Sequence, residues 1–216
     1  MTDGSGPRDW IEWHRAYADA DSPLTRRLAI VQAEVARAVQ ERGDAPIRVL
    51  SMCSGEGRDL IAPIASLGAG DRVRGRLVEL DPTLARRARD AIAAAELDGI
   101  EVREGDAGVT SAYAGAAPAD LVLVCGVFGN ISDAAIRRTV RALPALCADG
   151  ATVIWTRHRR PPDLTPAIRR WFRAAGFRHE AYIRVPDSPG SVGVERFVGT
   201  PAPFVPGERL FEFIES

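Results

Sequence analysis

The sequence predicts an α/β fold built around a mostly parallel sheet. Short apolar runs of strand length alternate with segments of helical periodicity along most of the chain, which is the pattern of successive βαβ units. Residues 121–124 are all apolar, as expected of a central strand that is buried on both faces. The 216 residues, 46% of them hydrophobic, are enough for one domain with a sizeable core.

The first strand of this pattern leads into a glycine-containing turn. The stretch 47–59 begins as a short apolar run, passes into small residues and glycines, and leads into residues 60–65, which have helical spacing. Such glycines let a ligand approach the backbone, and the start of the helix offers unpaired N–H groups and a partial positive charge. The turn therefore suits a nucleotide-like ligand, but glycine-rich turns are common and need a second signal.

The second strand supplies that signal. It covers residues 75–80 and carries Glu79 near its carboxyl end, 22 residues after Gly57. In doubly wound folds, an acid about 20 residues beyond the glycine turn binds the two ribose hydroxyls. Asp81 is followed by proline, which matches an N-cap with a first-turn proline and predicts a helix over residues 83–95. The turn and Glu79 together indicate an adenosine-containing cofactor.

The rest of the chain continues the alternation of strands and helices. Ser132 and the pair Thr165-Pro166 predict helix starts, and Gly176 ends the second of these helices. Before the first strand, Pro7 and the pair Ser22-Pro23 predict two more helices, which form an N-terminal helical extension. Further strands are expected at 100–104, 121–124, 151–156, 177–185 and 192–199, the last two as a hairpin-like pair.

Four segments, in the right order, resemble the motifs of class I S-adenosylmethionine-dependent methyltransferases. They are 49–59 (VLSMCSGEGRD), 77–82 (LVELDP), 103–107 (REGDA) and 119–127 (ADLVLVCGV). The resemblance covers residues 47–199. It implies a Rossmann-like sheet of seven strands in the order 3-2-1-4-5-7-6, mostly parallel, with an antiparallel last strand and helices on both faces. It also implies S-adenosyl-L-methionine as the cofactor.

The resemblance implies which residues hold that cofactor. Glu79 matches the acid that binds the ribose, and Asp106 matches the acid that binds the adenine amino group, with a simple turn residue as the other interpretation of Asp106. The chain departs from the family at Ser51 and Cys53, where an acid and a first glycine are usual, so the contacts to the methionine end stay open. The implied cofactor-binding set is Cys53, Ser54, Gly55, Gly57, Glu79, Leu80, Asp106, Ala107, Gly126 and Tyr17.

The implied domain organisation has three parts. Residues 1–45 form the helical extension, which either covers the site as a lid or only packs its tryptophans on the sheet. Residues 46–200 form the methyltransferase domain. Residues 201–216 form a tail that packs on that domain or on a partner subunit, as in a homodimer.

Few side chains are candidates for the transfer step itself. A methyl group on a sulfonium is already activated, so the protein must orient a nucleophile, exclude water and, for a hydroxyl or an ammonium, accept a proton. His158 after the fifth strand and His14 in the extension are candidate bases, with a structural or solvated histidine as the alternative. Asn130 after the fourth strand is a candidate hydrogen-bond partner of substrate or cofactor. No cluster has metal-ligand spacing, and no metal is expected.

A group of arginines, Arg157, Arg159 and Arg160, follows the fifth strand. Guanidinium groups bind carboxylates and phosphates bidentately, so this group could clamp an acidic substrate. The alternative is a solvated loop, which is slightly favoured in a chain whose 28 basic residues are all arginine.

The composition argues against several other classes of protein. A net charge of −1 gives no general attraction for nucleic acid or an anionic membrane surface. Residues 1–10 lack the apolar core of a secretion signal, and no apolar run reaches the roughly 18 residues of a membrane span. The three cysteines match neither a disulfide framework nor a zinc site. We therefore expect a soluble, cytoplasmic protein.

The sequence predicts a methyltransferase that acts on an oxygen or nitrogen of a small molecule. An RNA or protein substrate would keep the same reaction, with the arginine group as the contact. A non-catalytic protein that binds S-adenosylmethionine is a rival of another class, which the departures at Ser51 and Cys53 permit. A dinucleotide-dependent oxidoreductase is disfavoured, because the turn lacks Gly-x-Gly-x-x-Gly spacing and the chain has no lysine for a Tyr/Lys pair.

Overall fold

A computed structural model describes residue 19 and residues 22–214. The strands are β1 (Ile47–Met52), β2 (Val73–Glu79), β3 (Ile100–Glu104), β4 (Ala119–Val124), β5 (Cys147–His158), β6 (Phe177–Arg184) and β7 (Gly190–Phe197). The α-helices are α2 (Pro23–Glu41), α3 (Arg58–Ser66), α4 (Pro82–Ala94), α5 (Asp133–Ala142) and α6 (Thr165–Ala174). Three short 3-10 helices are η2 (Gly70–Arg72), η3 (Thr110–Tyr113) and η4 (Leu143–Ala145). The helix start predicted at Pro7 lies outside the described residues.

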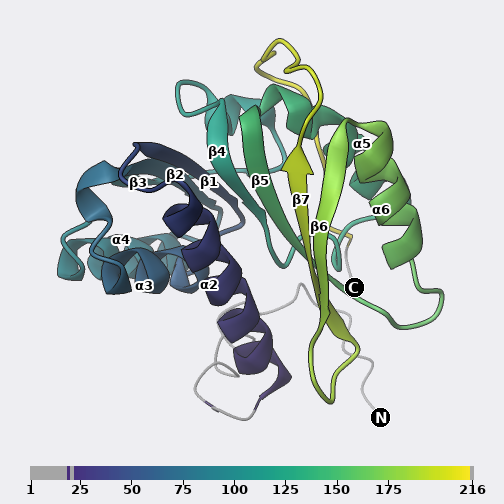
Figure 1. Ribbon diagram of the computed structural model, residues 1–216, viewed down its shortest axis with the longest axis horizontal. Coiled ribbons are helices and arrows are strands. Elements are labelled where there is room, and N and C mark those ends of the chain that lie inside the picture. The colour runs from purple at the N-terminus through teal and green to yellow at the C-terminus, as the bar shows by residue number, and fades with distance from the viewer. Residues whose placement is uncertain (1–18, 20–21, 215–216) are drawn as a thin grey trace.

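The strands form one sheet in the order β3-β2-β1-β4-β5-β7-β6 (Figure 1). Neighbours from β3 to β5 are parallel, whereas β7 runs antiparallel to both β5 and β6. The predicted strand order and the antiparallel last strand are therefore confirmed. The strand order reverses between β1 and β4, and ligands of such sheets bind at the carboxyl ends of the strands beside this reversal.

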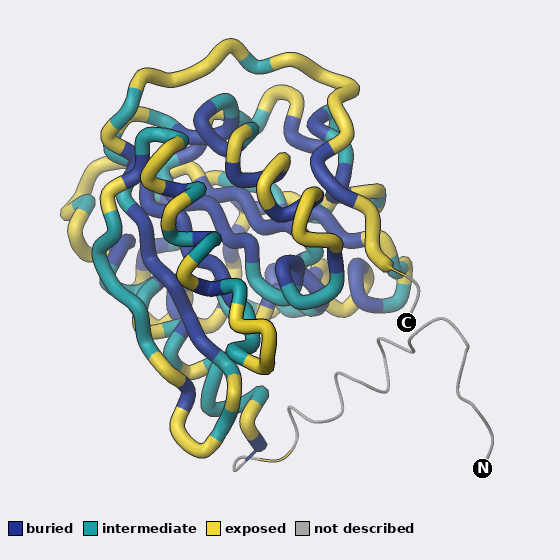
Figure 2. The backbone as a smooth tube through the Cα atoms, turned by 90° about the vertical axis from the view of Figure 1, so that its right-hand side faces the viewer, coloured by how far each residue is buried: buried dark blue, intermediate teal, exposed yellow. Residues whose placement is uncertain are grey.

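Side chains alternate between the two faces of the sheet, and each face has its own core. In β4, Leu121 and Leu123 belong to the cluster under α2 and α3, whereas Val122 and Val124 belong to the cluster under α5 and α6. All four are fully buried, which explains the continuous apolar run of this strand. Figure 2 shows the buried strands in the middle of the molecule, with exposed residues along the outer helices and loops. Helices thus cover both faces, as predicted.

Helix starts follow the predicted caps in three of four cases. The side chains of Ser22, Asp81 and Ser132 each accept an N–H of the first turn of the following helix. The prediction for Thr165 is wrong, because Thr165 is already the first residue of α6. The N-cap residue is Leu164, which has no side-chain cap, and Asp163 accepts both the N–H and the hydroxyl of Thr165, at 2.9 and 2.8 Å.

Strand β5 is longer than the sequence indicates. It covers Cys147–His158 instead of residues 151–156. The pairing of β4 with β5 shifts register between Ala119 and Leu121, and Gly150 lies in this irregular part with a φ of +71°. The turn-like residues before 151 are therefore accommodated as a bulge inside the strand.

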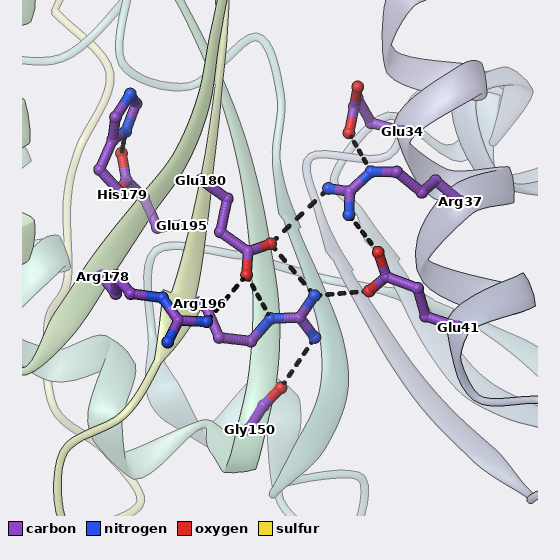
Figure 3. Close-up of polar contacts among 9 residues, drawn as sticks. All are labelled: Glu34, Arg37, Glu41, Gly150, Arg178, His179, Glu180, Glu195 and Arg196. Atoms are coloured by element: carbon purple, nitrogen blue, oxygen red, sulfur yellow. Dashed lines mark hydrogen bonds and ion pairs between the residues drawn. The ribbon is translucent and has the colours of Figure 1, made fainter.

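A network of charged residues ties α2 to the β6–β7 hairpin (Figure 3). Arg196 on β7 pairs with Glu180 on β6 at 2.9 Å and with Glu41 at the end of α2 at 2.5 Å, and it also donates to the carbonyl of Gly150. Arg37 on α2 approaches Glu180 to 3.7 Å. Hydrogen bonding by Arg196 lowers the pKa of Glu180, so this carboxylate stays charged. The network fixes the position of α2, which also contributes to the site described next.

Candidate functional site

A cavity of about 300 Å³ opens where the carboxyl ends of β1, β2 and β4 meet. Its volume lies in the range of small-molecule sites. Gly57 stands at the N-cap position of α3 rather than in the lining, and Tyr17 is outside the described residues. The other eight predicted cofactor-binding residues line the cavity: Cys53, Ser54, Gly55, Glu79, Leu80, Asp106, Ala107 and Gly126.

The turn between β1 and α3 has a left-handed backbone at three residues. The φ angle is +51° at Cys53, +56° at Gly55 and +71° at Gly57. At Gly57 a side chain is also excluded by packing, because a Cβ atom would lie 2.7 Å from the side chains of Ile61 and Leu77. Cys53, which replaces the usual glycine, adopts a glycine-like conformation at a cost of about 1–2 kcal/mol. The turn therefore keeps its tight shape despite this departure.

The carboxylate of Glu79 links the turn to the end of β2. Its Oε2 accepts the N–H of Gly55 at 2.7 Å, and its Oε1 accepts the N–H of Asp81 at 2.9 Å. The residue is 8% exposed; burial raises its pKa, and these backbone hydrogen bonds oppose the rise. A carboxylate has about four acceptor positions, so some remain for hydroxyl groups of a ligand. Glu79 is thus both a structural link and an acceptor at the cavity.

The wall beyond Glu79 combines an apolar surface with Asp106. Leu80 is 66% exposed, which is high for a large apolar side chain, and it offers a contact for a planar ring. Asp106 follows β3; its Oδ1 accepts the N–H of Gly108 at 2.7 Å, and its Oδ2 pairs with Arg209. An adenine amino group at Asp106 would share the carboxylate with this guanidinium, a partner that the sequence did not indicate.

The C-terminal tail returns to the cavity. Leu210 donates its N–H to the carbonyl of Gly108 at 2.7 Å, and Ile214 donates its N–H to the carbonyl of Asn130 at 2.9 Å. Between these two bonds, Phe213 lines the cavity. The tail therefore contacts the loops after both β3 and β4 and forms part of the wall.

The wall on the β4 side contains residues to which the sequence analysis gave no role. Arg27 comes from α2, Asp59 from the first turn of α3, and Cys125 follows β4. Burial raises the pKa of Asp59 to about 6, while N–H groups at the start of α3 and the charge of Arg27 oppose the rise. An acid directly after the glycine turn was a signal available for Asp59. Nothing local marks Arg27, because its place depends on how α2 packs.

Of the two candidate bases, only His158 is among the described residues, and it does not line the cavity. His158 ends β5 and lies beside Gly129. A Cβ atom added to Gly129 would be 4.0 Å from the Cδ2 atom of His158. Its Nδ1 is buried and has no hydrogen-bond partner among the described residues. Burial and the charges of Arg157 and Arg160 lower the pKa of His158, so the imidazole is neutral at pH 7. His14 is outside the described residues.

Asn130 holds the loop that follows β4. Its Nδ2 donates to the carbonyl of Gly126 at 2.6 Å, and the N–H of Gly126 donates to the hydroxyl of Thr156 on β5 at 2.8 Å. The loop is therefore fixed at its start against the neighbouring strand, and Asn130 has a structural contact in addition to any contact with a ligand.

The arginines after β5 are largely engaged with the main chain. Arg157 donates to the carbonyl of Phe128, and Arg159 donates to the carbonyl of Ser188 at 2.9 Å. Arg160 is exposed. The first two guanidinium groups fix loops near the sheet edge, which leaves fewer donors for the clamp that the sequence suggested.

The described residues contain neither a metal-binding cluster nor a membrane-spanning helix. Within residues 19 and 22–214, no three His, Cys, Asp or Glu side chains come together as a metal site needs, and no helix is long and apolar enough to cross a membrane. The thiols of Cys53, Cys125 and Cys147 are free, and burial raises the pKa of each, so they are protonated at neutral pH.

Comparison with known proteins identifies the fold. No protein-family profile and no curated protein sequence matches the chain. Magnesium protoporphyrin IX methyltransferase from Synechocystis PCC 6803, solved with bound SAM, has a TM-score of 0.67 and 14% identity, over 87% of this chain and 90% of that one. An O-methyltransferase family protein from Burkholderia thailandensis has a TM-score of 0.59 and 19% identity, over 88% of this chain and 69% of that one. A fibrillarin pre-rRNA processing protein from Methanococcus jannaschii has a TM-score of 0.57 and 17% identity, over 72% of this chain and 68% of that one.

At these identities the likeness concerns the fold and not the substrate. The chain has the fold of class I S-adenosylmethionine-dependent methyltransferases, as the four sequence motifs predicted.

Proposed function

We propose that this protein binds S-adenosyl-L-methionine and transfers its methyl group to an oxygen or nitrogen of a small molecule. The observation that carries the proposal is the Glu79 carboxylate, which reaches the cavity at the end of β2 and is fixed there by the N–H of Gly55. In doubly wound folds, an acid in this place binds a ribose. Neighbours solved with SAM or SAH bound support the same ligand.

The strand order supports one orientation of this ligand. Asp106 after β3 and Leu80 after β2 would receive the adenine, and Glu79 would receive the ribose. The turn 53–57 after β1 would then lie beside the sulfonium. The methyl group would point toward Gly126 and the loop that follows β4.

We infer that His158 accepts a proton from the methyl acceptor. It ends β5 beside the loop after β4, and its lowered pKa keeps the imidazole in the neutral form that can remove a proton. Asn130, which holds this loop through Gly126, would orient the acceptor rather than take part in the chemistry.

The substrate class rests on two observations. The net charge of −1 gives no general attraction for nucleic acid, and Arg157 and Arg159 already bind main-chain carbonyls. One structural neighbour acts, by its name, on magnesium protoporphyrin IX, which is a small molecule, whereas another is a pre-rRNA processing protein. RNA binding with a steep salt dependence would favour the RNA alternative.

Titration calorimetry with S-adenosylmethionine, S-adenosylhomocysteine and NAD tests the cofactor. We expect the first two to bind and NAD not to bind. Leu80→Ser should weaken S-adenosylhomocysteine by about 5–30-fold, because one lost apolar contact with the adenine is worth about 1–2 kcal/mol. Val198→Ser, also an exposed apolar residue but after β7, is the matched control. No binding of either methionine-derived ligand, or equal effects of the two variants, would refute the proposal.

A further inference from the structure

Five acidic residues line the cavity, and one of them has a carboxylate oxygen without a partner. Its Oδ1 is buried, and no hydrogen bond reaches it from any described residue. This residue is Asp59. A buried carboxylate oxygen in this state costs free energy unless a ligand donates to it. The other four acids all have hydrogen-bond or ion-pair partners: Glu56, Glu79, Asp81 and Asp106.

Asp59 has a cationic neighbour in the same wall. The charge of Arg27 acts on Asp59, yet no ion pair within 4.0 Å joins the two in the part of the chain that the structure describes. The two opposite charges therefore face one cavity without neutralising each other in direct contact. This arrangement matches a ligand that carries both an ammonium group and a carboxylate.

The pair comes from α2 and from the start of α3, whereas the residues expected to bind adenosine end or follow β2 and β3. Burial and the charge of Asp59 raise the pKa of Cys125 after β4, whereas burial and the charges of Glu79 and Asp106 raise the pKa of Cys53. In the sheet, β3, β2 and β1 precede β4 in that order. A ligand whose ribose binds Glu79 therefore extends its other end toward Asp59.

The first motif also lacks its usual acid. Ser51 occupies that position in β1 and is 1% exposed, and a hydroxyl carries no charge to offset an ammonium group. We propose that Asp59 binds the ammonium group at the amino-acid end of the cofactor and that Arg27 binds its carboxylate. This assignment rests on the proposed function, because it names the residues for one end of that ligand.

The test compares two ligands that differ only at this end. S-adenosylhomocysteine carries the amino acid, and methylthioadenosine does not. Asp59→Asn should weaken S-adenosylhomocysteine by about 10-fold or more, because a hydrogen bond to a charged group is lost, and should leave methylthioadenosine within about twofold. Asp90→Asn, an exposed acid on α4 that only approaches Arg86 to 3.8 Å, is the matched control and should change neither affinity.

Arg27 has its own ligand pair. Arg27→Gln should weaken the binding of S-adenosylhomocysteine by about 10-fold. The binding of decarboxylated S-adenosylhomocysteine, which lacks only the carboxylate, should change by no more than about twofold. Equal weakening of both ligands would remove the carboxylate role of Arg27.

A pH series on the wild-type protein gives a second measurement that does not depend on the folding of a variant. The ratio of the two affinities should rise in favour of S-adenosylhomocysteine as the pH rises from 5 to 8, because Asp59 then loses its proton. Arg27 on α2 and the Cys125 thiol after β4 face Asp59, and because burial raises the pKa of the thiol, it stays uncharged over this range. Glu79 and Asp106 would contact the part common to both ligands, so their contributions cancel in the ratio.

The possible failures are distinguishable. If the wild-type protein binds both ligands with a constant ratio across this pH range, or if Asp59→Asn weakens both ligands alike, the assignment of Asp59 is wrong and the proposed function stands. If the wild-type protein binds neither ligand, the proposed cofactor is wrong and this assignment is wrong with it.

Discussion

The Glu79 carboxylate has two expected roles, one as a structural link between the turn and β2 and one as the acceptor for the ribose. A substitution at Glu79 must be chosen so that the two roles can be measured separately. The carboxylate accepts the N–H groups of Gly55 and Asp81 in buried surroundings. In Glu79→Ala both N–H groups lose their acceptor, at a cost of about 1–3 kcal/mol each. The sum of about 2–6 kcal/mol is a large part of the roughly 5–15 kcal/mol that stabilises a typical domain. We therefore expect the alanine variant to lose its cofactor largely because the turn is displaced.

Glu79→Gln is the sharper perturbation. The amide oxygen keeps one of the two hydrogen bonds, and the amide nitrogen cannot accept the other. The expected loss of stability is about 1.5–3 kcal/mol, the value of one hydrogen bond to a charged group. Binding of S-adenosylhomocysteine should lose a second such bond, from a ribose hydroxyl, and so weaken by about 10–150-fold.

Two assays measure these losses separately. Urea denaturation without ligand gives the change in stability, and titration calorimetry with S-adenosylhomocysteine, under conditions where the variant is folded, gives the change in affinity. Glu101→Gln on β3, an acid of the sheet outside the cavity lining, is the control and should leave the affinity unchanged. A Glu79→Gln protein that is less stable but binds with wild-type affinity would show that the carboxylate is only a structural link.

Three further predictions follow from the structure. Gly57→Ala should lower the free energy of unfolding by about 2–4 kcal/mol in urea titrations, because φ is +71° and the new methyl group meets side chains at 2.7 Å, whereas Gly43→Ala, with φ +54° and open surroundings, should cost about 1 kcal/mol. Equal losses would contradict the packing argument. Burial raises the pKa of Glu195 in β7 from its ordinary 4.5 to about 7, so the folded state holds the proton more tightly than the unfolded state. The free energy of unfolding should therefore fall by up to about 3 kcal/mol as the pH rises from 4.5 to 7. Glu195→Gln should lack this decline when unfolding is measured at pH 5 and pH 8, and parallel behaviour of the two proteins would contradict the assignment. His158→Gln should keep the affinity for S-adenosylhomocysteine within about twofold and lose about 10²–10⁴-fold in turnover of its substrate, and full turnover would exclude the histidine as the base.

The fold could be predicted from local patterns because each element carries its own signal. Residues 121–124 are buried on both faces, and their continuous apolar run reports this directly. Ser22, Asp81 and Ser132 mark helix starts through short-range hydrogen bonds. The prediction failed at Thr165, where the helix begins one residue earlier than the Thr-Pro pair indicates, and in β5, where a bulge places turn-like residues inside a strand.

The candidate site could be predicted only where it is built from the motif loops. Glu79 and the turn 53–57 are contiguous with the strands that position them, so spacing was enough to find them. Arg27 and Phe213 reach the cavity through the packing of α2 and of the tail, and each depends on contacts between distant parts of the chain. The partner of Asp106 was missed for the same reason, because Arg209 is 103 residues away in the sequence.

The C-terminal tail contacts both the loop after β3 and the loop after β4. One of its backbone bonds reaches Gly108, next to the expected adenine acid, and the other reaches Asn130, in the loop beside the expected base. A ligand that competes with Arg209 for Asp106 would act on the same short segment that holds Asn130. Thermodynamic linkage makes such an effect reciprocal, so each substrate would change the affinity for the other by the same factor. The binding of cofactor and acceptor would then be coupled through this segment, which touches the loops of both subsites.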